Sequence, residues 1–270
     1  MEPALVCVDL DGTLTNPDKA VTKACRQALA DAVDAGLTVA FASGRDAKGI
    51  FSLMDEMGLP HTCAALSGAI SYLDGREVGH HTIEAGRVLE VVRVAERLGA
   101  YVGVSGADFW LPAGRIRWHP AFAKGRDPEE YTPYEDLYAA LPVHGDGFLK
   151  VSLHTDTGEE FENLREALSR IDGIVLARSD ANWLDVTAEG CTKAEGIGHL
   201  RQAIGLSPER VAMVGDDEND VAALRAAGLA IAMGNAAPSV KAVADVVVAD
   251  NAHDGCAEAL HLAIEKFTND

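Results

Sequence analysis

Two aspartates stand two residues apart in Asp9-Leu10-Asp11-Gly12-Thr13, directly after an apolar run that begins at Leu5. The run predicts a strand, and Gly12 is a residue at which the chain can turn. Two carboxylates this close repel each other unless a cation neutralises them or one of them holds a proton. The pair therefore indicates a Mg²⁺ site, an acid/base couple or both, and the alternative is an Asp-Gly turn without chemistry.

A second acidic cluster, Gly215-Asp216-Asp217-Glu218-Asn219-Asp220, follows the apolar run 211–214. The dipole of a helix favours acidic residues in its first turn, which accounts for some of these side chains. It does not account for Asp216 at the end of a strand, in the same position as Asp9. The carboxyl ends of parallel strands meet at one edge of a sheet, so we expect the two clusters to supply three carboxylates to one hard cation.

Two further segments offer groups that bind anions. The strand that ends in Phe41-Ala-Ser-Gly-Arg45 leads into a turn, where Ser43 and the backbone N–H groups can donate to anionic oxygens. Lys193 begins a helical pattern after Gly190-Cys-Thr. A cation in a first helical turn opposes the dipole unless an anion accompanies it, and the ordinary alternative is a solvated surface lysine.

Charge narrows the classes of partner. The chain has 270 residues, of which 48% are hydrophobic and 24% charged, as in globular proteins of about two domains. Its 23 Lys and Arg against 42 Asp and Glu give a net charge of −19, which repels nucleic acid and anionic membranes. An anionic ligand then needs a bound cation or a few local basic side chains.

Cysteine usage and the chain's opening predict a cytoplasmic protein. The five cysteines are widely spaced and never form a C-x-x-C pair, which indicates reduced thiols. The opening residues are too short and too acidic for a signal peptide, and no apolar stretch reaches about 18 residues. The sequence makes no prediction of the oligomeric state.

Both ends of the chain alternate short apolar runs with helical periods. Nearly continuous apolar strands predict a parallel sheet that helices cover on both faces, with its ligands at the carboxyl ends of the strands. The predicted strands are 5–10, 37–42, 62–66, 211–215, 228–232 and 246–248, and the predicted helices are 21–33, 47–57, 193–204 and 217–227.

The middle, residues 79–187, has a different pattern and is predicted to be an inserted α+β domain. Its helices are expected at 85–98, 133–141 and 159–171, and residues 115–127 are expected to form an irregular loop. In the strand 148–154, Lys150 alternates with apolar neighbours, as do Trp183 and Asp185 in the strand 182–187. Each strand therefore has one polar and one apolar face.

The order of these motifs resembles that of the haloacid dehalogenase superfamily of phosphotransferases. The resemblance spans nearly the whole chain and is greatest to the Cof-type, subclass IIB phosphatases, in Lys193-Ala-Glu-Gly, in Gly215-Asp-Asp-Glu-Asn-Asp-Val221 and in Ala232-Met-Gly-Asn235. It implies a Rossmann-like parallel-sheet core, formed by residues 1–78 and 188–270, and an inserted α+β cap of residues 79–187 that selects the substrate.

The resemblance also implies roles for the acidic residues. Asp9 would be the nucleophile that accepts a phosphoryl group, and Asp11 the general acid/base. Mg²⁺ would be held by Asp9, the Asp11 carbonyl and Asp216. Thr13 either helps Asp11 or is simply a turn hydroxyl.

The remaining residues of the implied site bind phosphate. Ser43, Gly44 and Lys193 would hold the oxygens of the transferring group, with Asn219 beside them, and Asp220 would fix Lys193. Phosphoryl transfer needs mainly in-line positioning and neutralised charge, so Ser43 and Lys193 count as catalytic. The family commonly has Asn-Gly-Ala where this chain has Ser67-Gly-Ala, which puts a side-chain amide contact at that point in doubt.

The sequence thus predicts a Mg²⁺-dependent hydrolase of a small phosphomonoester, with sugar phosphates favoured and an aspartyl-phosphate intermediate. A phosphomutase is the nearest alternative. Haloalkanoate hydrolysis is disfavoured because it needs neither Mg²⁺ nor Asp11, and a phosphate-sensing protein would be expected to lack Asp9 or Asp11. In the cap, Lys150, Trp183 and Asp185 are expected to contact the non-phosphate part of the substrate.

Overall fold

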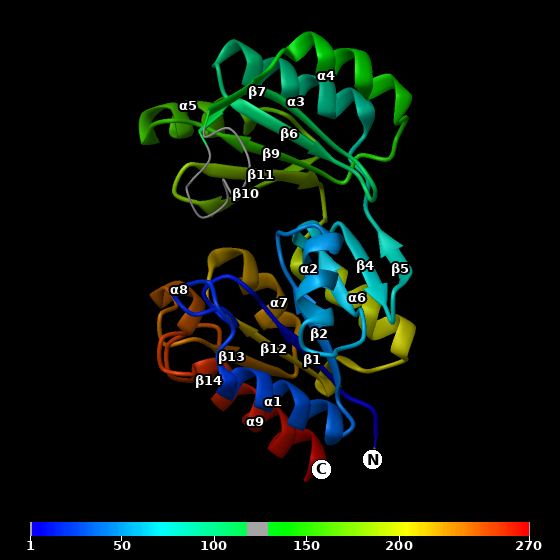
Figure 1. Ribbon diagram of the computed structural model, residues 1–270, viewed down its shortest axis with the longest axis vertical. Helices are drawn as coiled ribbons and strands as arrows, with labels where there is room; N and C mark the ends of the chain where they lie inside the picture. The colour runs from blue at the N-terminus through cyan, green and yellow to red at the C-terminus, as the bar shows by residue number, and fades with distance from the viewer. Residues whose placement is uncertain (1, 118–128, 270) are drawn as a thin grey trace. The chain divides into compact units, whose positions relative to one another are not determined.

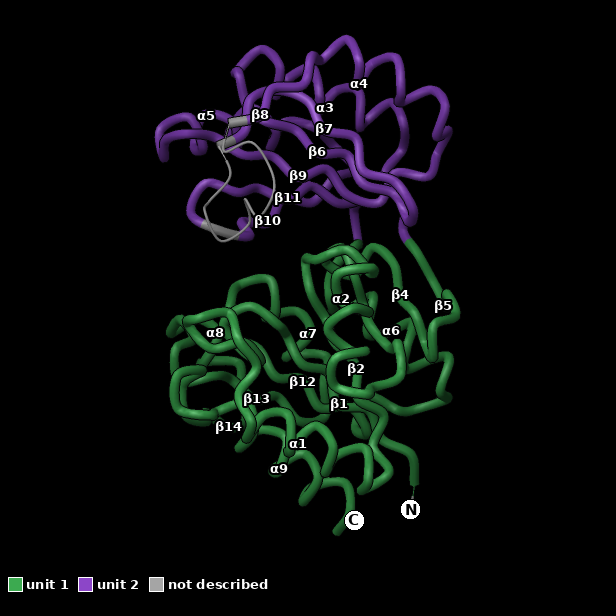
Figure 2. The backbone as a smooth tube through the Cα atoms, in the orientation of Figure 1, with its two compact units in different colours: residues 1–80, 191–270 green, residues 81–190 purple. Residues whose placement is uncertain are grey.

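The computed structural model describes residues 2–117 and 129–269, which divide into two compact units (Figure 2). Unit 1 consists of residues 1–80 and 191–270, and unit 2 of residues 81–190. Unit 2 therefore interrupts unit 1 along the chain. These bounds differ from the division drawn on the sequence, at 79 and 187, by two and three residues.

Unit 1 is built on a sheet with strand order β14-β13-β12-β1-β2-β3-β4-β5 (Figure 1). Neighbouring strands from β14 to β3 are parallel, which confirms the predicted Rossmann-like parallel core. The strands are β1 Leu5–Val8, β2 Thr38–Ala42, β3 Cys63–Ala65, β4 Ile70–Leu73, β5 Arg76–His80, β12 Val211–Gly215, β13 Leu229–Ala232 and β14 Val246–Val247. All four residues of β1 are fully buried, as expected for a strand covered on both faces.

The antiparallel hairpin of β4 and β5 was not among the predicted strands. Asp74 and Gly75 connect the two strands with φ angles of 50° and 75°. Two consecutive positive φ angles match the right-handed twist of a two-residue hairpin, and Asp-Gly is a favoured pair for that turn. The turn signal was present in the sequence, but residues 76–80 lack the apolar run by which the other strands were found.

The helices of unit 1 largely follow the predicted periods. They are α1 Lys23–Asp34, α2 Ala47–Asp55, α6 Lys193–Ile204, α7 Val221–Ala226, α8 Pro238–Lys241 and α9 Gly255–Thr268. In α1 the buried residues recur at helical spacing, and the Thr22 hydroxyl caps the helix by accepting the Cys25 N–H. The predicted helix at 217–227 is instead a 3₁₀ turn, Glu218–Asp220, followed by α7, because Asp220 uses its side chain to hold the preceding backbone.

Unit 2 contains an antiparallel sheet of order β10-β11-β9-β6-β7-β8, in agreement with the predicted α+β class. The strands are β6 Tyr101–Ser105, β7 Trp110–Arg117, β8 Glu129–Thr132, β9 Lys150–His154, β10 Ile174–Asp180 and β11 Trp183–Ala188, and the helices are α3 Ala85–Arg97, α4 Tyr134–Ala140 and α5 Gly158–Leu168. Val151, Leu153, Leu184 and Val186 belong to a buried apolar cluster with residues of these helices. The predicted alternation along β9 and β11 is therefore correct for the apolar face.

The prediction of an irregular loop at 115–127 is wrong for residues 115–117. Residues 115–117 end β7 and pair with β8, with Arg115 opposite Tyr131 and Ile116 opposite Glu130. A charged strand at a sheet edge has little apolar pattern, so its pairing is visible only in three dimensions. Residues 118–127 of that expected loop lie outside the described residues. In the described part of the chain, no helix has the length and apolar composition needed to cross a membrane.

Candidate active site

Three carboxylates converge at the carboxyl edge of the unit 1 sheet. Asp9 follows β1, and Asp216 follows the neighbouring strand β12, whose Val214 is paired with Val8. One oxygen from each of Asp9, Asp216 and Asp220 lies within 4.8 Å of the others. We call these residues the carboxylate cluster. The parallel register thus brings together two acids that are 207 positions apart in the sequence.

Lys193 is the cation of this cluster. Its side chain is almost completely buried, and its Nζ donates to Asp9 Oδ1 at 2.6 Å and to Asp220 Oδ1 at 2.7 Å. Burial alone would lower the pKa of Lys193, but the Asp220 and Asp9 carboxylates raise it above its usual value. Lys193 is therefore an ammonium, and the two carboxylates compensate for its place in the first turn of α6.

A glycine brings the start of α6 close to β3. Gly68 has a φ of 93°, and a Cβ at this position would lie 2.1 Å from the Thr192 carbonyl oxygen. The residue before it, Ser67, also has a left-handed backbone, with a φ of 62°, and its N–H donates to the Ser43 carbonyl at 2.9 Å. Asparagine tolerates this conformation better than most residues, whereas Ser67 adopts it at some cost in strain.

Asp220 is fully engaged within the cluster. It is completely buried, and its Oδ2 accepts the backbone N–H groups of Asp216 at 3.0 Å and Asp217 at 3.1 Å, while Oδ1 holds Lys193. Both oxygens thus have partners within the chain. Asp220 is suited to orient Lys193 and the loop after β12 rather than to bind a metal.

Asp216 is held by two side chains, one of which the sequence left unassigned. Thr13 Oγ1 donates a hydrogen bond to Asp216 Oδ1 at 2.6 Å. The hydroxyl therefore holds Asp216, and neither of the two roles predicted for it, help to Asp11 or a turn hydroxyl alone, describes this contact. Asn235 Nδ2 donates to Asp216 Oδ2 at 3.2 Å and to the Gly12 carbonyl at 2.9 Å. Asn235 was quoted as part of a motif but had no predicted role, and the motif was the only available signal.

The electrostatics of the cluster favour a divalent cation. Burial raises the pKa of Asp9 to about 8 against the opposing effect of Lys193, and Asp220 and Asp216 add to the rise. Burial also raises the pKa of Asp216 to about 6, although the Thr13 hydrogen bond opposes it. Three acids with one ammonium leave an excess of negative charge, and the donors are all oxygens. This donor set fits a hard cation such as Mg²⁺.

Asp11 lies outside the carboxylate cluster and has different partners. Arg45 donates through Nε to Asp11 Oδ2 at 2.9 Å and through a terminal nitrogen to Oδ1 at 2.8 Å, and Lys19 Nζ lies 3.2 Å from Oδ1. Partial burial would raise the pKa of Asp11, but these two cations lower it below its usual value. Neither Arg45 nor Lys19 had a predicted role.

The predicted phosphate-binding residues lie at the same edge of the sheet. Ser43 is buried at the end of β2, its Oγ accepts the Arg45 N–H at 3.2 Å, and Gly44 is half-buried beside it. Asn219 is half-buried, and its side-chain Oδ1 is buried without a hydrogen-bond partner among the described residues. A buried amide with an unused acceptor is unusual in a folded protein and fits a site that a ligand completes.

The predicted cap residues form a hydrogen-bonded group in unit 2. Lys150 and Asp185 are both buried, with Lys150 Nζ 3.1 Å from Asp185 Oδ2, and Ser152 donates to Asp185 Oδ1 at 2.8 Å. The Trp183 ring lies 4.8 Å from the ring of His154, measured between centroids. Lys150 and Asp185 are therefore each other's partners, which the sequence did not anticipate.

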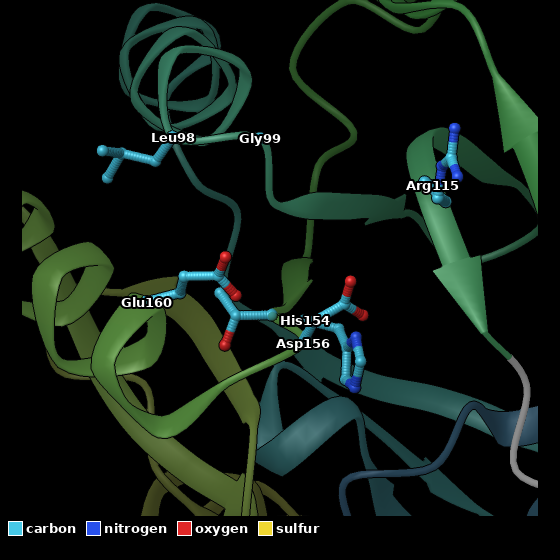
Figure 3. Close-up of a pocket in the computed structure, with 7 residues that line it drawn as sticks. Leu98, Gly99, Arg115, His154, Asp156 and Glu160 are labelled. Atoms are coloured by element: carbon cyan, nitrogen blue, oxygen red, sulfur yellow. The ribbon is translucent and has the colours of Figure 1, made fainter.

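Aromatic rings and a cavity adjoin this group. The Tyr101 ring lies 6.0 Å from Trp183 and 6.4 Å from Trp110, between centroids, and Trp110 is 43% exposed. A Cβ on Gly103 would come within 2.6 Å of Trp110 Nε1, so this glycine lets the indole lie against β6. A cavity of about 320 Å³ lies in unit 2 (Figure 3), lined by Leu98, Gly99, Arg115, His154, Thr155, Asp156 and Glu160.

Known proteins are similar to this chain over nearly its whole length. The family model for haloacid dehalogenase-like hydrolases matches residues 6–260. A 5-amino-6-(5-phospho-D-ribitylamino)uracil phosphatase of Bacillus subtilis is 25% identical over 95% of this chain and 94% of its own. A pyridoxal phosphate phosphatase of Escherichia coli is 25% identical over 97% and 98%.

A solved structure shows the same fold. A subclass IIB sugar phosphatase of the superfamily has a TM-score of 0.79 at 23% identity, over 97% of this chain and 99% of that one. The family model, which matches residues 6–260, covers every residue of the site described in unit 1. The chain therefore belongs to the haloacid dehalogenase-like hydrolase family.

Proposed function

We propose that the protein is a Mg²⁺-dependent phosphatase of small phosphorylated metabolites that works through an aspartyl-phosphate. The observation that carries this proposal is the buried Asp9, held by Lys193 within a cluster of three carboxylates. Membership of a hydrolase family and the names of the two relatives, both phosphatases, support it. Release of inorganic phosphate from a panel of phosphomonoesters, measured with the purified protein and Mg²⁺, tests it.

In the first half of the reaction, a carboxylate oxygen of Asp9 attacks phosphorus, and the bond from phosphorus to the ester oxygen breaks. Asp11 would act as the general acid that gives a proton to the leaving oxygen, and for this step it must leave its contacts with Arg45 and Lys19, which favour its ionised form. Lys193 neutralises charge on the transferring group, and Ser43, Gly44 and Asn219 receive its other oxygens. Mg²⁺, held by Asp9, the Asp11 carbonyl and Asp216, would supply further positive charge at this group.

In the second half, water attacks the phosphorus of the aspartyl-phosphate and passes a proton to Asp11. Inorganic phosphate leaves, and the Asp9 carboxylate is restored. A phosphomutase would return the phosphoryl group to a second hydroxyl of the substrate instead, and a phosphate-sensing protein would bind without turnover. Phosphate release in many cycles per protein molecule distinguishes the hydrolase from both alternatives.

Metal removal is expected to abolish activity, and the affinity for Mg²⁺ is expected to become weaker as the pH is lowered. Burial raises the pKa of Asp9 to about 8 and that of Asp216 to about 6, so protons compete with Mg²⁺ for both carboxylates as the pH falls. Titration calorimetry with Mg²⁺ at pH 5, 6.5 and 8 should therefore show the weakest binding at pH 5. Full activity after exhaustive EDTA treatment, or stronger binding at pH 5, would contradict the proposed metal site.

For the substrate we propose a phosphorylated sugar or polyol, whose non-phosphate part contacts Lys150, Trp183 and Asp185 of the cap. The fold neighbour is a sugar phosphatase, and the Bacillus subtilis relative is named for a uracil that carries a phosphorylated ribitylamino group. The rings of Tyr101, Trp110 and Trp183 favour a substrate that also bears a planar ring, because aromatic side chains stack on such groups.

Trp183→Ala is expected to lower kcat/KM for the preferred substrate by about tenfold, the loss that one aromatic contact produces. Hydrolysis of methyl phosphate, which carries no ring for the cap to contact, should change by less than about twofold, since the residues that carry out the chemistry are unchanged. Trp183 is preferred to Lys150 for this test because removal of Lys150 leaves Asp185 buried without its ion-pair partner.

The matched control is Tyr131→Ala, which removes an aromatic ring of unit 2 that is 64% exposed. It should leave the preference among substrates unchanged. Equal losses on all substrates in Trp183→Ala, or no loss on any, would show that this face of the cap does not select the substrate.

A further inference from the structure

Asn235 joins the two loops that carry the proposed metal ligands. Its Nδ2 donates to Asp216 Oδ2 at 3.2 Å, in the loop after β12, and to the Gly12 carbonyl at 2.9 Å, in the loop after β1. Gly12 directly follows Asp11, whose carbonyl is also a proposed ligand. One side chain therefore links the supports of two ligands that come from different strands.

The orientation of the Asn235 amide is determined by its partners. Its Oδ1 accepts the Asn251 N–H at 3.0 Å, so the oxygen faces a donor while the nitrogen faces two acceptors. The reverse orientation would place an oxygen against the oxygens of Asp216 and Gly12. Because Oδ1 is engaged by Asn251, Asn235 acts toward the site as a donor to a ligand and not as a ligand itself.

The loop that presents Asn235 is itself anchored. It follows β13, and Gly234 donates its N–H to the Ala249 carbonyl at 3.0 Å and accepts Lys241 Nζ at 2.6 Å through its own carbonyl. A Cβ on Gly234 would lie 2.7 Å from the Asp250 nitrogen, so the close approach of these two loops requires glycine. Asn235 therefore extends from a fixed backbone.

A second asparagine holds the loop after β1 at another point. Asn251 Nδ2 donates to the Thr15 carbonyl at 2.9 Å. Within that loop, the Thr15 N–H and the Thr15 hydroxyl both donate to the Leu10 carbonyl at 2.9 Å. The loop is thus closed on itself, and side chains from the C-terminal part of the chain hold it at two points.

Asp216 lies in close contact with the loop that Asn235 holds. A Cβ on Gly12 would lie 2.3 Å from Asp216 Oδ2, so the backbone of the loop after β1 passes directly against this carboxylate. Thr13 donates to the other oxygen, Oδ1, at 2.6 Å. Without Asn235, Thr13 would be the only hydrogen-bond donor to the Asp216 carboxylate among the described residues, and the carboxylate could turn about that one contact.

We propose that Asn235 is a positioning residue that holds Asp216 and the loop after β1 in a fixed arrangement, and thereby favours Mg²⁺ over Ca²⁺. This inference rests on the proposed function. Mg²⁺ requires nearly ideal octahedral geometry, whereas Ca²⁺ accepts longer and less regular contacts. Side chains that orient metal ligands typically change metal affinity by about 10- to 100-fold. A site whose ligands are less firmly held should therefore lose affinity for Mg²⁺ more than for Ca²⁺.

The test is titration calorimetry of wild type and Asn235→Ala, with Mg²⁺ and with Ca²⁺, at pH 8. Asn235→Ala should weaken Mg²⁺ binding by about tenfold and Ca²⁺ binding by less than about threefold, so that the ratio of the two dissociation constants changes. Asn251→Ala removes a more distant support and should weaken Mg²⁺ binding by about two- to threefold.

The matched control is Asn269→Ala, which removes an exposed asparagine of unit 1 at the end of α9. Both of its dissociation constants should equal those of wild type. The melting temperature of each metal-free variant shows whether the fold is intact, and Asn235→Ala should melt close to wild type because this side chain is exposed. If Asn235→Ala does not fold, the ratio of the dissociation constants in Asn251→Ala decides in its place.

The outcomes separate the two levels of inference. Equal weakening of Mg²⁺ and Ca²⁺ binding would indicate a general defect of the site and overturn the positioning role. Unchanged affinity for Mg²⁺ would also overturn it, and in both cases the phosphatase stands. If wild type binds no Mg²⁺ at pH 8, the proposed metal site fails and the positioning role fails with it.

Discussion

Asp9→Asn is expected to remove turnover of every phosphomonoester, by about 10⁴-fold or more, as the loss of a nucleophile does in other enzymes. An amide is a poor nucleophile and a poor ligand for a hard cation. The fold should persist, because Lys193 keeps its contact with Asp220 at 2.7 Å and an amide oxygen at position 9 can still accept from Lys193. Thermal stability at neutral pH should therefore be close to that of wild type.

Two measurements check this result. Steady-state release of phosphate gives the loss of activity, and acid-quenched protein exposed to a ³²P-labelled substrate shows whether a phosphoryl group is trapped. Label should appear on wild type and be absent from Asp9→Asn. Asp34→Asn, which changes an exposed carboxylate at the end of α1, is the matched control. Substantial activity or retained label in Asp9→Asn would disprove the aspartyl-phosphate.

Lys193→Met is expected to lose activity and also to destabilise unit 1. Lys193 is the buried cation between Asp9 and Asp220, and its removal leaves the carboxylate cluster without compensation. Breaking a buried ion pair from one side typically costs about 3–5 kcal/mol in the free energy of unfolding. Chemical denaturation at neutral pH measures the loss, and the exposed Lys48→Met is the control.

The destabilisation should depend on pH with a definite sign. Lys193 lowers the pKa of Asp9, in opposition to burial, so its removal should raise that pKa further. The folded variant then keeps a proton on Asp9 at pH values where the unfolded chain, with a carboxyl pKa near 4, has released it. Stability is then lost as the pH rises above the unfolded pKa, and Lys193→Met should be less destabilised at pH 5 than at pH 8. The double variant Lys193→Met/Asp220→Asn should recover stability but not activity. A loss that is equal at both pH values would argue against uncompensated carboxylates.

The sequence alone was sufficient to predict the parallel core and the sheet edge at which Asp9 and Asp216 meet. Apolar runs that end in Asp9, Ser43 and Asp216 predicted strands whose carboxyl ends meet, because burial on both faces requires continuous apolar residues and the chain turns where they stop. The start of α6 at Lys193 and the alternation in β9 were predicted correctly for the same reason. These features depend on the local periodicity of apolar residues, which can be seen in a short stretch of sequence.

Only the tertiary structure decided which side chains form hydrogen bonds and ion pairs with one another. Thr13 could serve Asp11 or its own turn by sequence, yet it donates to Asp216, 203 positions away. Other contacts likewise join segments that share no local sequence pattern. They are the ion pairs of Asp11 with Arg45 and Lys19, the ion pair of Lys150 with Asp185, and the pairing of β7 with β8. Such contacts depend on distances that only the packed sheet sets, because a side chain's partner is chosen by geometry and charge rather than by proximity in sequence.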